Sequence, residues 1–463
     1  MRCAALALLS LSFLLAAPAF AADAPPTGIP AAPVLDDAML APLAPSVRVV
    51  STWQDVSGYL RARSVDIRNA QTDVYRAEAQ SRTALAAILG TLNLNASATA
   101  NFITNTTAQV SGVDALGNPT YGKVTTPSPG YASGSLVAAI PIIAPRAWNT
   151  IRTAHINEDV MLAQLDDTKR LITQSVASAV VSVVTTERVA ELNRSGLRAA
   201  LERLDLTKRR RELGVGTGLD LVRAQQDVEA SRATLITGDE SVRQAREALG
   251  IALGVGEPMG VAPSLDLDGV VDDFLAHCKI APSAEERADV IAARARMTLA
   301  HQAVTDAKMM FLPILSAQST VSTTTQNLGA TPPVQWNVQG VLSWSIWDGG
   351  VRYGALRDGH GQEAQAAERL EATRRTAIVQ IAQADRGVQV AEASRVVAAR
   401  SRDLALQLDK LTQAGFMVGQ GTSLELVTAA AGLRQAEISL ALQEFGLLQA
   451  RLLAVLNRAS CPL

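Results

Sequence analysis

The stretch Leu213-Gly-Val-Gly-Thr-Gly-Leu-Asp-Leu-Val222 recurs without gaps as Val418-Gly-Gln-Gly-Thr-Ser-Leu-Glu-Leu-Val427. Two glycines, the threonine, two leucines and the final valine are identical in the two copies, and Asp220 is matched by Glu425. The copies lie about 205 residues apart, which is much longer than the period of a solenoid repeat. The pair therefore predicts an internal duplication in which each half contains one glycine-rich turn.

A long segment without proline precedes each of these turns, at 146–213 in the first half and 350–418 in the second. An uninterrupted helix over 146–213 would be on the order of 100 Å long, since an α-helix rises about 1.5 Å per residue. Helices of this length are typical of coiled coils and related assemblies. A further helix is expected after each turn, over 219–253 and over 422–457.

The segments before the long helices have the two-residue period of β-strands. Over about 90–103, Leu92 and Leu94 alternate with Asn93 and Asn95, which gives the strand one apolar face and one polar, uncharged face. Three further strands are expected at about 131–140, 314–323 and 335–346. Each half therefore supplies two strands.

The second half repeats the polar strand face, because Ser316, Gln318, Thr320 and Ser322 correspond in position to Asn93, Asn95, Ser97 and Thr99 of the first strand. Between the first two strands, glycine and proline interrupt residues 104–130, and we expect a loop there.

The N-terminal residues predict the compartment. Residues 1–21 combine Arg2, an apolar run and the small-residue pattern Ala19-Phe20-Ala21, which is typical of a secretory signal peptide. Cys3 lies too early to accept a lipid at the cleavage site, so no lipid anchor is expected. The rest of the chain is expected to divide into an extended linker, repeat 1, an inter-repeat segment, repeat 2 and a tail, at 22–50, 51–253, 254–283, 284–457 and 458–463.

The composition and the pattern narrow the class of protein. Hydrophobic residues make up 48% of the chain and aromatic residues only 4%, which suits long helices better than a mixed enzyme core. The formal net charge of −2 indicates no nucleic-acid partner. No later stretch is expected to be long and apolar enough for a membrane helix, so a membrane location would require a β-barrel. Four strands cannot close a barrel, for which about eight are needed, so several chains must share one.

No catalytic, metal or cofactor site is expected. The four histidines, His155, His277, His301 and His360, are scattered and form no metal-ligand pair at i, i+4. The segment Gly214-Val-Gly-Thr-Gly218 connects two helices and lacks the preceding strand of a dinucleotide-binding loop. We therefore expect a protein that is not an enzyme.

Two further motifs accompany the duplicated turns. Glu286-Arg287-Ala288-Asp289-Val290 opens a helix that ends at Leu312-Pro313, and Trp344-Ser-Ile-Trp-Asp-Gly-Gly350 joins the last strand to a long helix. With these motifs in this order, the chain resembles the TolC family of outer membrane factors over essentially its whole mature length.

The resemblance implies a mainly α-helical fold with a membrane β-barrel. A homotrimer would share a twelve-stranded barrel in outer-membrane lipid and extend an α-helical tunnel into the periplasm. It also implies two partners, a periplasmic adaptor (membrane fusion) protein and an inner-membrane pump.

The resemblance assigns adaptor docking to the two turns. The matching residues are Leu213, Gly214, Val215, Val418, Gly419 and Gln420. A plain helix–helix turn would explain the glycines almost as well, since glycine permits a tight reversal.

The family also narrows its tunnel with acidic residues near these tips, which Asp220 and Glu425 match. A threefold axis would turn each into a ring of carboxylates that favours cations. The alternative is that both acids merely occupy first helical turns, where they suit the helix dipole.

The family's closed tip can use a tyrosine and an arginine at positions that are Phe416 and Gly421 here. Phe416 is therefore counted with the constriction, while the hydroxyl and guanidinium links are missing. Arg211 and Asp409 are a candidate replacement link.

Cys278 and Cys461 are the only cysteines left after signal removal, in a compartment that oxidises thiols. Cys278 lies between the repeats and Cys461 just past the last helix, so the duplication places both at the same level of the tube. We expect a disulfide between them, with two independent thiols as the alternative.

The expected function is the exit duct of a tripartite efflux or type I secretion system, a passive conduit through the outer membrane. Small-molecule efflux and protein secretion both stay open. The alternative from another class is a trimeric periplasmic or surface coiled-coil spacer without a pore. The uncharged polar strand faces favour a wet lumen and therefore the duct.

Overall fold

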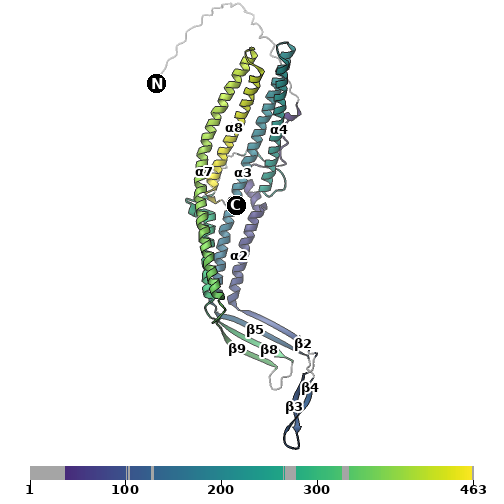
Figure 1. The fold of residues 1–463 in the computed structure, drawn as a ribbon, viewed down its shortest axis with the longest axis vertical. Helices are drawn as coiled ribbons and strands as arrows, with labels where there is room; N and C mark the ends of the chain where they lie inside the picture. The colour runs from purple at the N-terminus through teal and green to yellow at the C-terminus, as the bar shows by residue number, and fades with distance from the viewer. Residues whose placement is uncertain are drawn as a thin grey trace, which may run out of the picture.

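The protein is a long bundle of helices with a small β-sheet at one end (Figure 1). The computed structural model describes residues 37–100, 102, 105–126, 130–263, 265, 269, 278–325 and 333–460. The expected signal peptide, His277 and Cys461 lie outside the described residues.

Seven helices of ten or more residues are described. Their bounds are α1 (Trp53–Arg63), α2 (Val65–Leu89), α3 (Pro145–Glu212), α4 (Gly218–Ala252), α6 (Ala288–Met309), α7 (Val351–Met417) and α8 (Ser423–Leu456). The two longest, α3 with 68 residues and α7 with 67, occupy the two long segments without proline. Pro145 stands in the first turn of α3, where a missing backbone N–H costs no helical hydrogen bond.

The helices form two sections that follow one another along the long axis of the bundle. In the half nearer the sheet, α2, α3, α6 and α7 pack side by side in that order. In the other half, α3 pairs with α4 and α7 pairs with α8, and the two hairpins meet where α8 contacts α3 and α4. We call the free ends of these hairpins the tips.

The sheet contains four antiparallel strands in the order β2-β5-β8-β9. Their bounds are β2 (Thr91–Thr99), β5 (Tyr131–Ile143), β8 (Ile314–Thr324) and β9 (Val334–Ser343). Leu94 lies opposite Leu136 and Asn95 opposite Ser135, so apolar and polar side chains gather on separate faces. No helix covers either face, and the outer edges of β2 and β9 have no partner within the described chain (Figure 1).

The expectation of a loop over 104–130 is wrong for most of that segment. Residues there form a hairpin of β3 (Asn105–Val113) and β4 (Pro119–Thr126). The Asp114 carboxylate accepts hydrogen bonds from the N–H groups of Leu116 and Asn118 at 2.9 and 2.8 Å, and Gly117 has a φ of 82°. The glycine and proline signals mark the turn of a hairpin, and the flanking threonines and valines form its strands.

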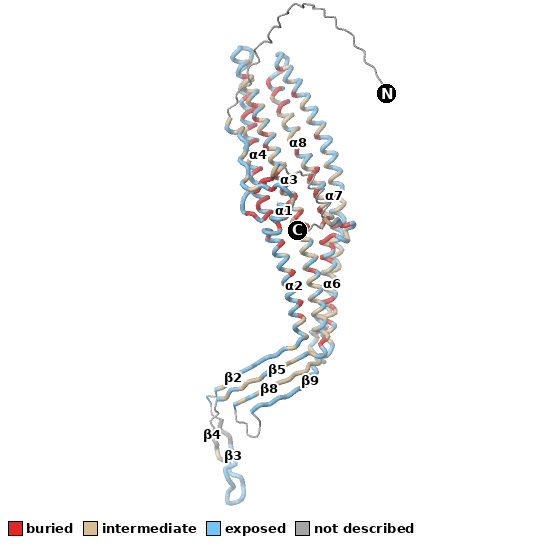
Figure 2. The backbone as a smooth tube through the Cα atoms, turned by 180° about the vertical axis from the view of Figure 1, so that it is seen from behind, coloured by how far each residue is buried: buried red, intermediate tan, exposed pale blue. Residues whose placement is uncertain are grey.

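Short elements surround the middle of the bundle, and we call this region the girdle. β1 (Arg48–Val50) pairs in parallel with β6 (Met259–Val261), and β7 (Lys279–Ile280) pairs antiparallel with β10 (Ala459–Ser460). The 3₁₀ turn η2 (Ala284–Glu286) lies beside them. Many of the buried residues gather here (Figure 2), in a core that includes Val50, Leu60, Leu249 and Met259.

The described part of the expected linker packs on the bundle. Asp37, before the 3₁₀ turn η1 (Ala38–Leu40), forms an ion pair of 2.8 Å with Arg232 of α4. Met39 and Leu40 pack against a buried cluster of α3 and α4 that includes Leu197. Residues 37–50 therefore run along the α3–α4 hairpin toward the girdle.

One further expectation is wrong. Within Ser423–Leu456, α8 is long and apolar enough to cross a membrane by length and composition alone, with a mean hydropathy of 1.3. Leu448, Leu452 and Leu456 of α8 are buried against Ala177 and Val181 of α3, although only 22% of the apolar window is buried within the chain.

Candidate functional site

The two tips have the same backbone. Gly214 and Gly419 end α3 and α7 with φ values of 78° and 81°, a left-handed conformation that glycine adopts without strain. The N–H of Val215 donates to the Arg210 carbonyl oxygen at 3.0 Å, and the N–H of Gln420 donates to that of Gly415 at 2.9 Å. The sequence match therefore corresponds to matching turns.

Each tip continues with the same helix start. Thr217 and Asp220 form a capping box at α4, and Thr422 and Glu425 form one at α8. The Asp220 carboxylate accepts from the Thr217 N–H at 3.1 Å, and the Glu425 carboxylate accepts from the Thr422 N–H at 2.8 Å. Both acids thus stabilise the N-termini of their own helices. A role in a constriction needs neighbouring copies and stays a prediction.

The two carboxylates differ in their surroundings. Asp220 also accepts a hydrogen bond from the hydroxyl of Ser423 on α8, which joins the two hairpins. That hydroxyl, followed by Thr217, lowers the pKa of Asp220 below its ordinary value. Glu425 is exposed, and within the described residues its carboxylate bonds only in its own capping box. The Glu425 carboxylate therefore has fewer hydrogen bonds and is less constrained than that of Asp220.

Apolar side chains project from both tips. Leu213, Val215 and Val418 are 78%, 68% and 71% exposed. A Cβ added at Gly214 or Gly419 would meet no atom within 4 Å. Clustered exposed apolar residues typically mark a surface that binds a partner.

The structure places Phe416 between the hairpins. Its side chain is 6% exposed and lies under Arg210 of α3, with 4.2 Å from the guanidinium carbon to the ring centre. Arg210 also donates to the Phe416 carbonyl oxygen at 2.7 Å. Within the chain Phe416 joins the two tips, a contact that sequence reasoning missed.

Arg211 and Asp409 do not pair in the described chain. Asp409 of α7 is 6% exposed, and its cationic neighbour is Arg203 of α3. Burial raises the pKa of Asp409, and Arg203 partly opposes this shift. Arg203 itself binds Asp227 of α4 at 2.7 Å.

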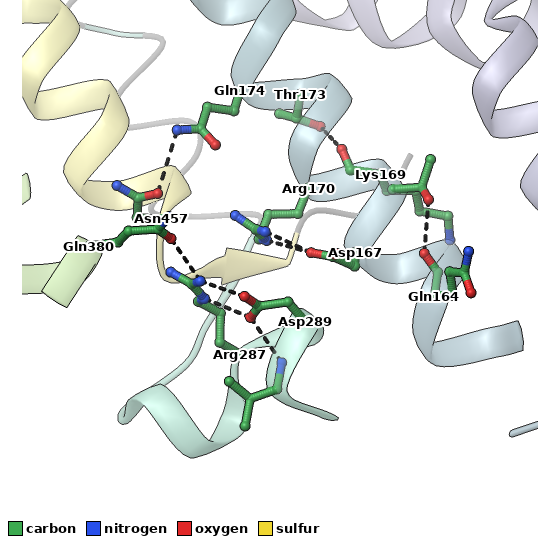
Figure 3. A network of polar contacts seen from close by, with 12 residues as sticks. Gln164, Asp167, Lys169, Arg170, Thr173, Gln174, Arg287, Asp289, Gln380 and Asn457 are labelled. Atoms are coloured by element: carbon green, nitrogen blue, oxygen red, sulfur yellow. Dashed lines mark hydrogen bonds and ion pairs between the residues drawn. The ribbon is translucent and has the colours of Figure 1, made fainter. Parts of the chain in front are cut away.

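The motif around Arg287 forms a polar network in the girdle (Figure 3). The guanidinium of Arg287, whose residue is 2% exposed, binds the carboxylate of Asp289 with its Nε at 2.7 Å and donates to Gln380 of α7 at 2.8 Å. The first turn of α6 is thereby fixed against α7. The motif therefore has a structural role at this level of the bundle.

The motif Trp344–Gly350 connects β9 of the sheet to α7. The Asp348 carboxylate accepts from the N–H of Gly350 at 3.0 Å and from Nε of Arg352 at 2.7 Å. The Trp344 indole donates to the Phe311 carbonyl oxygen at 3.2 Å, which ties this junction to the end of α6.

Cys278 is disulfide-bonded in the structure. It directly precedes Lys279 of β7, and Lys279 lies opposite Ser460 of β10. Cys461 lies outside the described residues, so the pairing of the two cysteines stays a prediction.

Two histidines that are far apart in the sequence share one carboxylate. Nδ1 of His301 on α6 lies 2.6 Å from one oxygen of Glu363 on α7, and Nδ1 of His360 lies 3.5 Å from the other. No group of metal-ligating side chains suited to an ion is found among the residues that the structure describes.

Solved outer-membrane proteins have the same fold. VceC from Vibrio cholerae has a TM-score of 0.68 at 19% identity and covers 87% of this chain and 95% of its own. CmeC from Campylobacter jejuni has a TM-score of 0.70 at 14% identity and covers 94% and 93%. The long hairpins, the four-stranded sheet and the girdle are thus a fold that this chain shares with these outer-membrane proteins.

The family model "Outer membrane efflux protein" matches residues 56–255 and 281–454, which is more than half of the chain. The protein belongs to this family. It is an outer-membrane protein whose helices extend into the periplasm.

The toluene efflux pump outer membrane protein TtgC of Pseudomonas putida is 26% identical over 220 residues. The alignment covers 46% of this chain and 45% of that relative, so the chain spans about half the length of the relative it matches.

Proposed function

We propose that three copies of the chain form an exit duct through the outer membrane, with one shared twelve-stranded barrel and one α-helical tunnel. The observation that carries the proposal is the sheet. In a single chain its outer edges are unpaired within the described residues and both of its faces are uncovered. Open strand edges cannot face lipid, because their backbone groups would lose hydrogen bonds.

The two faces of the sheet suit two different solvents. Trp336 and Val338 of β9 are 73% and 67% exposed, as lipid-facing residues would be. On the other face, Gln318 bonds Gln339 at 3.1 Å, and no charged residue occurs in β2, β5, β8 or β9. A closed barrel with the polar face inside satisfies both faces.

The helices support the same assembly. In one chain, α7 leaves Val390, Val397, Leu404 and Leu411 more than half exposed. Neighbouring copies would bury these side chains by packing helix against helix and continuing the bundle into a tube. Each half of the chain contributes one tip and two strands, so such a tube would be built from nearly equivalent halves.

The tips are the proposed docking site for a periplasmic adaptor, which would link the duct to an inner-membrane pump. The support is the exposed apolar surface of Leu213, Val215 and Val418 beside the turns of Gly214 and Gly419. The name of the relative TtgC favours efflux over type I protein secretion, which is the second candidate cargo path.

Near the tips, we assign the constriction to rings of Glu425 and, more weakly, Asp220. Three copies of the exposed Glu425 around an axis would favour cations. Asp220 is engaged with Ser423 and contributes a more fixed charge.

Planar-bilayer recording tests the duct against the spacer alternative. Purified protein should give steps of ion conductance, and a pull-down from cell envelopes should recover an adaptor and a pump. A protein that inserts as a trimer but never conducts, under conditions that open a known family channel, would favour the spacer.

A further inference from the structure

A large groove lies on the sheet-side half of the bundle. Its volume is about 1350 Å³, and it is lined by α2, α3, α6 and α7. Because α2, α3, α6 and α7 pack in that order, a groove that touches all four lies on one concave face of their layer. Within the proposed trimer this face would line the tunnel.

The lining of the groove combines apolar and neutral polar groups. Alanines such as Ala84, Ala154 and Ala303 form much of the wall, and Thr83 and Gln365 add hydrogen-bonding groups. Sites for small molecules typically have this composition, with a few polar groups on a mostly apolar surface.

All of the formal charge in the lining is positive. Arg296 of α6 and Arg369 of α7 are the charged residues that line the groove, and no aspartate or glutamate among the described residues lines it. Arg296 donates to the neutral Gln164 at 2.7 Å. Within the described residues, neither arginine forms an ion pair, although Arg294 and Arg375 on the same helices bind Glu285 and Glu371 at 2.6 and 2.8 Å.

We propose that this groove binds amphiphilic organic anions, such as carboxylates or sulfonates with an apolar body. The apolar body would lie on the alanines, and the anionic group would bind Arg296 and Arg369. A guanidinium offers a planar fork of donors that matches a carboxylate or sulfonate, and such charge-assisted bonds are stronger than neutral ones.

The groove and the tips would then carry opposite charges along one path. Glu425 at the tip favours cations, whereas Arg296 and Arg369 favour anions nearer the sheet. Only this placement along a transport path rests on the proposed function. Binding in the groove is a property of the purified protein and is measured without conduction.

The test uses three probes of one shape, which are naphthalene-2-sulfonate, naphthalene-2-sulfonamide and 2-naphthylmethylammonium. Isothermal titration into protein in lipid nanodiscs, with empty nanodiscs subtracted, should show the sulfonate binding most tightly. The double variant Arg296→Gln/Arg369→Gln should weaken sulfonate binding by about tenfold or more, since two charged contacts are lost. The matched control Arg294→Gln/Arg375→Gln should bind like the unchanged protein.

Any of three results would overturn the proposal: no binding of the sulfonate, equal binding of the three probes, or full affinity in the double variant. If native mass spectrometry showed that the double variant alone loses its trimer, the groove would be a contact between subunits, and the proposal would fall. A protein that binds the sulfonate through both arginines but fails to conduct would contradict the duct and leave the groove standing.

Discussion

The guanidinium of Arg210 covers the ring of Phe416, 206 residues further along the chain, and donates to its carbonyl oxygen at 2.7 Å. This contact joins the end of α3 to the end of α7, at the level where the tips of the two hairpins meet. With the hydrogen bond from Ser423 to Asp220, it holds the two tips of the chain together.

Removing Arg210 should loosen the tips. A cation–π contact contributes about 0.5–2 kcal/mol, and a charged hydrogen bond about 1.5–3 kcal/mol. Arg210→Ala should therefore raise the open probability in planar bilayers by more than about tenfold, since about 1.4 kcal/mol corresponds to tenfold. Arg209→Ala is the matched control, because Arg209 pairs with Asp205 of its own helix at 2.9 Å. Equal conductance in the two variants would show that the link does not restrain the tips.

Glu425→Gln should reduce cation selectivity. A glutamine can replace the glutamate of a capping box, so the helix start survives while a ring of three charges disappears. Reversal potentials measured in a salt gradient should move toward the value of a non-selective channel. Block by multivalent cations should weaken. Glu229→Gln, on an exposed turn of α4, serves as the control. Unchanged reversal potentials would place Glu425 outside the conducting path.

The tips can be tested for docking without disturbing their glycines, whose positive φ values would strain any other residue. Val215→Asp combined with Val418→Asp should abolish adaptor binding, because it places charges on an apolar contact surface. Trimer yield and conductance should stay normal. Full export and adaptor pull-down by this variant would exclude the tips as the docking site.

The disulfide between Cys278 and Cys461 is a separate prediction. Lys279 lies opposite Ser460 in an antiparallel pair, so one further step in the same register would bring Cys278 opposite Cys461, and Cys278 is disulfide-bonded. Thiol titration of unfolded, non-reduced protein should find no free thiol once the signal peptide is removed. Chain-entropy models give about 4–5 kcal/mol for so long a loop. Two titratable thiols, or a mass that shows Cys278 bonded elsewhere, would contradict the pairing.

Asp409→Asn should stabilise the protein near neutral pH. Burial raises the folded-state pKa of Asp409, so its contribution to stability is present below the unfolded pKa and is lost as the pH rises. Asparagine keeps the acceptor for Gln413, which donates to Asp409 at 3.0 Å, without the buried charge. The melting temperature should rise by about 1–2 °C at pH 7 and change little near pH ~3.5. A lower melting temperature at pH 7 would show that the charge stabilises the fold through Arg203.

Local signals made much of the fold predictable. The matched glycines and the Thr217 and Thr422 capping residues predict helix ends from a few neighbouring residues. The alternation of leucine and asparagine in β2 gives the strand and its faces in the same way. These features depend on residues that lie close to each other in the sequence.

Other features depend on contacts between distant residues. The Arg210–Phe416 contact, the shared carboxylate of His301 and His360, and the cationic groove each join separate helices, so no local pattern reports them. The β3–β4 hairpin was missed for a different reason. Its turn residues are also those of a loop, and within the described chain its strands pair only with each other.

Native mass spectrometry of the detergent-solubilised protein tests the central claim most directly, because four strands per chain require several chains to close a barrel. We predict that the species with pore activity has the mass of three chains and that monomers do not conduct. A stable monomer that conducts ions would contradict it.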